Sequence, residues 1–82
     1  MRPGYMVDLI HRFNNIKRNS YDLEKKLESL NQLISDVEEA CEMPIDDNEA
    51  MQEFIKNNVF LYNVYLDFIE EREETEDDLV LD

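Results

Sequence analysis

The scarcity of glycine and proline is the feature that most limits how this chain can fold. One glycine and two prolines occur in 82 residues, so few positions suit sharp turns or strand-connecting loops. Hydrophobic residues make up 43% of the chain, with four tyrosines and four phenylalanines, which is too apolar for a disordered acidic tail. Together these features predict an all-α fold of long helices in one small domain.

Apolar residues in the first half recur in alternating steps of three and four, the spacing of a heptad repeat. The repeat keeps its phase on both sides of Ser20, which favours one continuous helix from about residue 5 to residue 42. Asn19 and Ser20 are nevertheless weak helix formers. A break at these two residues, giving three helices in all, therefore stays open.

A turn is predicted at residues 43–46, because the residue before Pro44 disfavours helical backbone angles. Asp46 is expected to cap the next helix, and Glu49 three residues later completes a capping-box pattern. This second helix is predicted to run from about residue 47 to residue 72.

Apolar residues cover about half the circumference of the second helix, more than one neighbouring helix can cover. With one long first helix per chain, a second neighbour must come from another copy. We therefore predict a long, coiled-coil-like helical hairpin that pairs into a dimeric four-helix bundle, or, if the first helix breaks, a monomeric three-helix bundle. The predicted core and dimer positions are Leu23, Leu27, Leu30, Ile34, Val37, Phe54, Leu61, Tyr65 and Phe68.

The net charge of −13 is divided unequally along the chain. Residues 1–27 carry six basic and three acidic groups, whereas the rest carries two basic and eighteen acidic groups. Residues 73–82 are expected to form an acidic tail that frays into solvent, because like charges repel one another. In an antiparallel hairpin this tail would return beside the basic first helix. So acidic a surface repels nucleic acid, and direct nucleic-acid binding is not expected.

No apolar stretch approaches the roughly 18 residues that a membrane-spanning helix needs. A signal peptide is not expected either, since no charged segment precedes an apolar run. The single cysteine, Cys41, cannot form a disulfide within the chain, which favours a reducing cytoplasm.

No pattern in the sequence predicts catalysis, a metal or a cofactor, so we expect that the chain is not an enzyme. His11, the one histidine, falls on the solvent side of the heptad repeat. Cys41 falls in the apolar seam, where a small buried hydrophobe is expected. The segment 46–49 resembles the start of a calcium loop but lacks the central glycine and the terminal glutamate of that loop.

Two features predict binding to a protein partner. Phe60 lies in the polar arc of the second helix with Val64 nearby, and an exposed aromatic on a charged face is a candidate anchor. Acidic residues bracket the predicted turn and are candidates for steering a basic partner. These residues are Glu38, Glu39, Glu42, Asp46, Asp47, Glu49 and Glu53.

The leading functional hypothesis is a cytoplasmic regulatory or adaptor protein that binds another protein through its helical surface. The alternative is a nucleic-acid mimic that inhibits a DNA- or RNA-binding enzyme, because spaced carboxylates on a rigid hairpin could imitate a phosphate backbone. In size and acidity the chain is similar to small accessory proteins of phages and plasmids.

Overall fold

The computed structural model describes residues 4–19 and 22–81, and over these residues the chain is helical with no strand. The all-α fold class is therefore confirmed. The four helices are α1 (Tyr5–Arg18), α2 (Leu23–Ala40), α3 (Asn48–Asn57) and α4 (Val59–Leu81). Because there are four helices, neither the two-helix hairpin nor the three-helix alternative is right in full.

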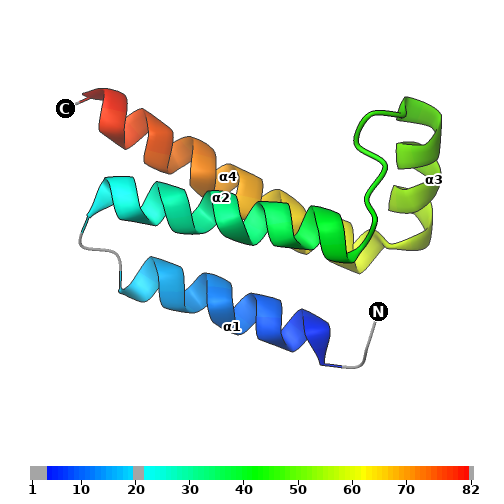
Figure 1. Ribbon diagram of the computed structural model, residues 1–82, viewed down its shortest axis with the longest axis horizontal. Helices are drawn as coiled ribbons and strands as arrows, with labels where there is room; N and C mark the ends of the chain where they lie inside the picture. Colours follow the sequence, from blue (N-terminus) through cyan, green and yellow to red (C-terminus); the bar gives the residue numbers. More distant parts are fainter. Residues whose placement is uncertain (1–3, 20–21, 82) are drawn as a thin grey trace.

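Helices α1, α2 and α4 pack along one another, whereas α3 stands at one end of the molecule (Figure 1). Helix α2 runs antiparallel to both α1 and α4 (Figure 1). Helix α4 contacts both α1 and α2, while α3 packs on α4. The wide apolar arc of α4 therefore finds two neighbouring helices within one chain.

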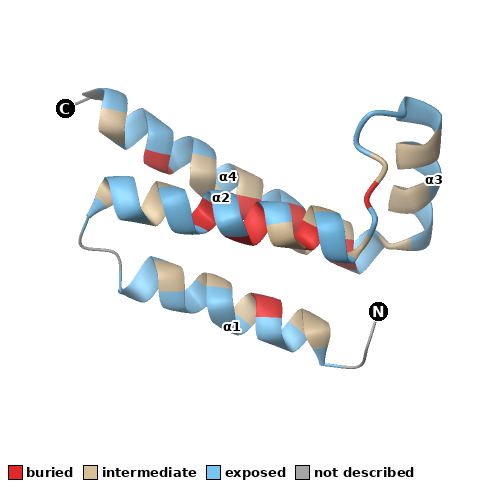
Figure 2. Cartoon of the chain, viewed as in Figure 1, coloured by how far each residue is buried: buried red, intermediate tan, exposed pale blue. Residues whose placement is uncertain are grey.

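The core lies where the three long helices meet (Figure 2). Leu33 and Val37 of α2 are fully buried, as is Phe68 of α4. Phe13 of α1 closes the core, with its ring centroid 4.8 Å from that of Phe68. The buried apolar residues are Leu9, Leu30, Leu33, Ile34, Val37, Met43, Leu61, Tyr65 and Phe68.

The continuous first helix predicted over residues 5–42 is wrong, because α1 ends at Arg18 and α2 begins at Leu23. Asp22 caps α2, and its Oδ1 accepts hydrogen bonds from the backbone N–H groups of Glu24 at 2.9 Å and Lys25 at 3.4 Å. Such a cap satisfies amides that would otherwise lack partners at a helix start. Weak helix formers and this cap outweigh the unbroken heptad phase. Ser20 lies outside the described residues.

Helix α3 begins one residue later than predicted, because Asp47 rather than Asp46 is its N-cap. The Oδ1 atom of Asp47 accepts a hydrogen bond from the backbone N–H of Ala50 at 3.1 Å. Both carboxylates precede the same apolar run, so the sequence pattern alone does not separate them.

The predicted second helix is interrupted at Asn58, which has non-helical backbone angles between α3 and α4. The side-chain amide of Asn58 donates a hydrogen bond to the backbone carbonyl of Phe54 at 2.9 Å. This carbonyl would otherwise accept the amide of residue 58 in an unbroken helix. The side chain thus replaces a helical hydrogen bond and stabilises the corner.

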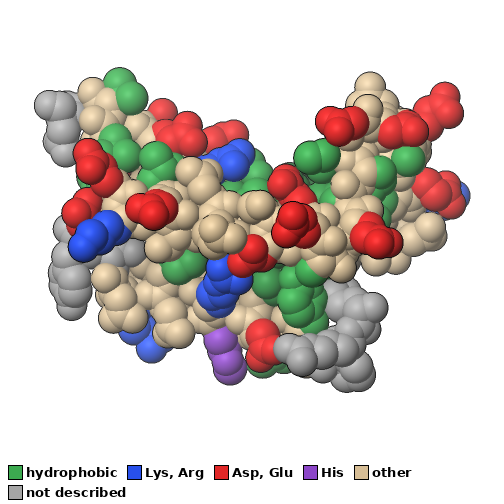
Figure 3. Space-filling model, viewed as in Figure 1, with side chains coloured by type: hydrophobic (Ala, Val, Ile, Leu, Met, Phe, Trp, Pro, Cys, Tyr) green, Lys and Arg blue, Asp and Glu red, His purple; other side chains and the backbone are tan. Residues whose placement is uncertain are grey.

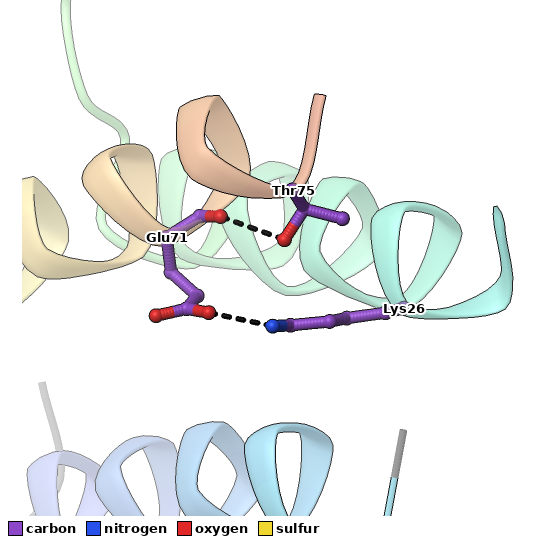
Figure 4. A network of polar contacts seen from close by, with 3 residues as sticks. All are labelled: Lys26, Glu71 and Thr75. Atoms are coloured by element: carbon purple, nitrogen blue, oxygen red, sulfur yellow. Dashed lines mark hydrogen bonds and ion pairs between the residues drawn. The ribbon is translucent and has the colours of Figure 1, made fainter. Parts of the chain in front are cut away.

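Helix α4 continues to Leu81, whereas a fraying tail was expected from residue 73 onward. Thr75 is fully buried, and its hydroxyl donates to the backbone carbonyl of Glu71 at 2.8 Å. On the same turn, Lys26 of α2 donates from Nζ to Glu71 Oε2 at 2.6 Å (Figure 4). Packing and this partly buried ion pair outweigh the repulsion among like charges.

Burial within one chain accounts for most of the predicted core and dimer positions. Six of them are buried, namely Leu30, Ile34, Val37, Leu61, Tyr65 and Phe68. The other three are half-buried, namely Leu23, Leu27 and Phe54. None of these placements requires a second copy of the chain.

Candidate functional site

Phe60 lies at the start of α4 with 67% of its surface exposed, beside Val59 at 58%. It is the one aromatic residue among the large apolar side chains that stand exposed in the described part of the chain. Val64, by contrast, is half-buried and packs against the core. Of the two predicted anchor residues, only Phe60 is therefore free to enter a partner's pocket.

Glu38 does not lie free on the surface. The hydroxyl of Tyr65 on α4 donates a hydrogen bond to Glu38 Oε2 on α2 at 2.6 Å. Burial raises the pKa of Tyr65 strongly, and the adjacent Glu38 carboxylate adds to this rise, because both disfavour the phenolate. Glu38 thus joins α2 to α4 through this hydrogen bond.

Glu42, two residues after the end of α2, has a left-handed backbone conformation with φ 50°. The amide of Met43 donates to the carbonyl of Glu38 at 3.0 Å, and that of Glu42 to Glu39 at 3.2 Å. This pair of hydrogen bonds is a Schellman motif, in which glycine usually occupies the left-handed position. Met43, the next residue, is buried and anchors the turn to the core.

The remaining predicted acidic residues project from the end of α2, from the turn and from α3, and all are exposed. On the lobe that α3 forms, acidic side chains stand well apart from one another (Figure 3). Asp47 is engaged as the α3 cap, whereas the others leave carboxylate oxygens facing solvent. We define the acidic turn as Glu39, Glu42, Asp46, Glu49 and Glu53.

A hollow of about 270 Å³ lies below the corner between α3 and α4. Cys41 contributes to its lining, and burial raises the pKa of the Cys41 thiol. The lining residues are Ala40, Cys41, Glu42, Phe54, Asn58 and Leu61. No group of three potential metal ligands comes together among the described residues.

Basic residues gather at the opposite end, around a hollow of about 510 Å³ between α1 and α2. Two of them are already paired within the chain. Arg12 lies 2.8 Å from Asp36, and a hydrogen bond from Gln32 together with Arg12 holds the pKa of Asp36 below its usual value. Lys26 is bound to Glu71. Lys25, the third basic residue that lines the hollow, is exposed.

A further apolar surface on α4 was not singled out as a site from the sequence. Val59, Tyr62, Leu66 and Ile69 follow one another in steps of three and four along the helix. Leu66 is 42% exposed, while Tyr62 and Ile69 are half-buried. The sequence signal was present in the wide apolar arc, but it was assigned to a dimer core. We call these four residues the outer stripe.

Comparisons with protein-family models, with curated proteins and with solved structures give no match for this chain. Within the described residues, no helix combines the length and the apolar content needed to cross a membrane. Phe60, the acidic turn and the outer stripe are the surfaces of the described residues from which a function can be inferred.

Proposed function

We propose that the chain is a cytoplasmic regulatory or adaptor protein that binds a protein partner and catalyses no reaction. The observation that supports this most is the exposure of Phe60, because the other aromatic side chains in the described residues are buried or pack partly against the core. Transfer of an aromatic ring from water into a protein pocket contributes about 2–3 kcal/mol. Phe60 is thus suited to act as an anchor at the interface.

The acidic turn favours a partner that has a basic surface. Its five carboxylates lie on the α2 end, the turn and α3, at the end of the molecule where α4 begins (Figures 1 and 3). The negative electrostatic potential of these carboxylates speeds association with a basic protein, and this effect weakens as the salt concentration rises. The anchor would then slow dissociation, and the acidic turn would speed association.

The anchor can be tested by affinity capture from cells of the native host with three immobilised proteins. They are the wild type, Phe60→Ala, and Val80→Ala, which removes another exposed apolar side chain at the far end of α4. We expect a protein that the wild type and Val80→Ala retain in high salt and that Phe60→Ala loses. Identical retention by all three would contradict the role of Phe60.

The acidic turn can be tested by reversing charges that have no structural contact. Glu39→Lys, Asp46→Lys and Glu49→Lys together spare the Glu38 hydrogen bond and the Asp47 cap. With the captured partner, association should slow at low salt while dissociation stays the same. An unchanged association rate would show that these carboxylates are merely solvated and do not attract the partner.

A nucleic-acid mimic is the second candidate, and the helical acidic end of α4 favours it. Glu70, Glu73, Glu74, Asp77 and Asp78 are exposed on a continuous helix. Residues three or four apart on a helix have Cβ atoms about 5–6 Å apart, so the carboxylates form regular rows. A mimic should displace nucleic acid from its target enzyme and lose potency steeply as salt rises. Failure to compete with nucleic acid would leave only the adaptor function.

The homodimer stays a prediction. The apolar arc of α4 does not require a second copy, because α1 and α2 of the same chain cover most of it. Light scattering at micromolar concentration should distinguish one chain mass from twice that mass. A dimer would have to use a surface that the chain leaves uncovered.

A further inference from the structure

Helix α4 carries two apolar stripes with heptad spacing. The inner stripe contains Leu61, Tyr65 and Phe68, which are buried against α1 and α2. The outer stripe, Val59, Tyr62, Leu66 and Ile69, keeps the same spacing but lies about 100° further round the helix. Heptad spacing is the pattern that receives a second helix by knobs-into-holes packing. In this structure the inner stripe has such neighbours. In the outer stripe, Tyr62 and Ile69 pack partly against the core, whereas Val59 and Leu66 are exposed.

The contacts of α4 show which flank is open. Phe68 meets Phe13 of α1, and Tyr65 and Arg72 reach Glu38 and Asn31 of α2. Turning about 100° per residue places the outer stripe on the flank of α4 away from the Phe68–Phe13 contact with α1. Helix α3 rises on the side of α2 and α4 opposite α1 (Figure 1). On that side the molecular surface is hollowed between the α3 lobe and the far part of α4, with hydrophobic side chains visible in the hollow (Figure 3).

The acidic residues that continue the line of the outer stripe favour a partner with basic residues. The same heptad positions continue as Glu73 and Glu76, and Asp77 flanks them, all exposed. A helix lying along this surface needs apolar residues against the first half and basic residues against the second half. A second copy cannot supply the basic residues from α4, because its one base there, Arg72, already contacts Glu76 and Asn31.

We infer that the outer stripe of α4 binds an amphipathic helix of a protein partner, with heptad-spaced apolar residues followed by lysine or arginine. This inference goes beyond the function proposed above, because Phe60 lies on the opposite flank of α4 and takes no part in it. The stripe is apolar from Val59 to Ile69 and its line continues as the acidic Glu73 and Glu76, so it also sets the direction in which the partner helix lies.

The test uses a synthetic helical peptide with leucines at three heptads of a and d positions and lysines at the flanking positions near one end. Its binding to the full chain is measured by fluorescence anisotropy at two salt concentrations, with a glutamate-for-lysine peptide as control. Wild-type protein should bind only the lysine peptide. Leu66→Asp should weaken binding by about tenfold or more, since it places a charge in the apolar seam.

A matched pair of charge reversals separates a specific site from general attraction to an acidic protein. Glu73 lies on the line of the outer stripe, whereas Glu74 borders a small hollow with Phe13 and Lys17 on the α1 side. Glu73→Lys should weaken peptide binding several-fold and flatten its salt dependence, while Glu74→Lys should leave it near the wild-type value. Circular dichroism confirms that each variant is folded, and the Glu73 and Glu74 pair remains decisive if Leu66→Asp unfolds.

Three results would overturn the inference. Equal weakening by Glu73→Lys and Glu74→Lys would mean that only net charge attracts the peptide. A wild-type dimer that Leu66→Asp dissociates would mean that a second copy covers the stripe. Loss of peptide binding in Phe60→Ala but not in Leu66→Asp would place the peptide on the other flank, and the function proposed from Phe60 would then still stand.

Discussion

Glu42 and Tyr65 are the two residues whose local environments have the clearest measurable consequences. Glu42 has a left-handed backbone that only glycine adopts without steric cost. Tyr65 keeps a buried hydroxyl satisfied through Glu38. Both lie near the predicted acidic site, so variants there change stability as well as surface charge.

Replacing Glu42 with glycine should stabilise the protein by about 1 kcal/mol, because it removes the Cβ clash of the left-handed conformation. The Schellman hydrogen bonds at the end of α2 would be kept. Urea unfolding followed by circular dichroism measures the change, and Glu42→Ala is the control that removes the charge but not the Cβ. Equal stability of the glycine and alanine variants would contradict the assigned backbone strain.

Tyr65 should make the protein less stable in alkaline solution. Its pKa is raised in the folded state, so the fold favours the protonated hydroxyl. The contribution of the protonated Tyr65 hydroxyl to the free energy of unfolding is complete below the unfolded-state pKa of about 10. It is lost as pH rises above that value. Chemical unfolding at pH 7 to pH 11 measures this, and Tyr65→Phe should show a smaller loss over the same range. Parallel curves for the two proteins would show that other groups cause the decline.

At the scale of elements, single polar side chains mark the boundaries between helices. Asp22 starts α2, Asp47 starts α3, and Asn58 separates α3 from α4. The interruptions at Asp22 and Asn58 fall within stretches whose apolar spacing is continuous in sequence, whereas the start of α3 follows the turn predicted at Pro44. The order of helices therefore depends on single polar residues rather than on the hydrophobic pattern.

Asn58→Leu should join α3 and α4 into one continuous helix. Residues on both sides of position 58 share one apolar face, and leucine favours helix by about 0.5 kcal/mol over asparagine. The variant also removes the side-chain hydrogen bond to the Phe54 carbonyl. Backbone chemical shifts of residues 56–60 measure helicity, with Asn57→Leu as the control on the exposed face. A persistent break in Asn58→Leu would show that α3 packing, and not the cap, sets the corner.

At the scale of the whole molecule, one core joins three helices that the chain places side by side. Leu30 is fully buried in that core, whereas Leu27, one turn earlier on α2, is half-buried. In a dimeric hairpin the two positions would be equivalent seam residues. The single chain thus distinguishes positions that the heptad repeat treats alike.

Leu30→Ala should therefore destabilise the protein by about 3 kcal/mol, and Leu27→Ala by about 1 kcal/mol. Urea unfolding at several protein concentrations measures both values. An unfolding midpoint that rises with concentration, with equal costs at the two positions, would instead support the dimeric bundle. Leu30→Asp should unfold the chain outright, because it buries an unpaired charge.

The sequence by itself determined the helical class, the positions of the main apolar faces and the start of the second half near Pro44. It also marked Phe60 as an exposed aromatic and grouped the carboxylates around the turn. Periodicity and composition are local properties, so they can be read without knowing which helices meet. They predicted six of the buried positions but missed Leu33, which is buried because α2 has neighbours on two sides.

Tertiary structure alone decided which polar residues are engaged and which apolar faces are covered. Glu38 is held by Tyr65 from 27 positions away in sequence, and Lys26 holds Glu71 from 45 positions away, which keeps the acidic end helical. No local pattern reports such pairs. The break between α1 and α2 brings α1 against α4, so one chain fills the inner stripe, while the outer stripe around Leu66 remains for another helix.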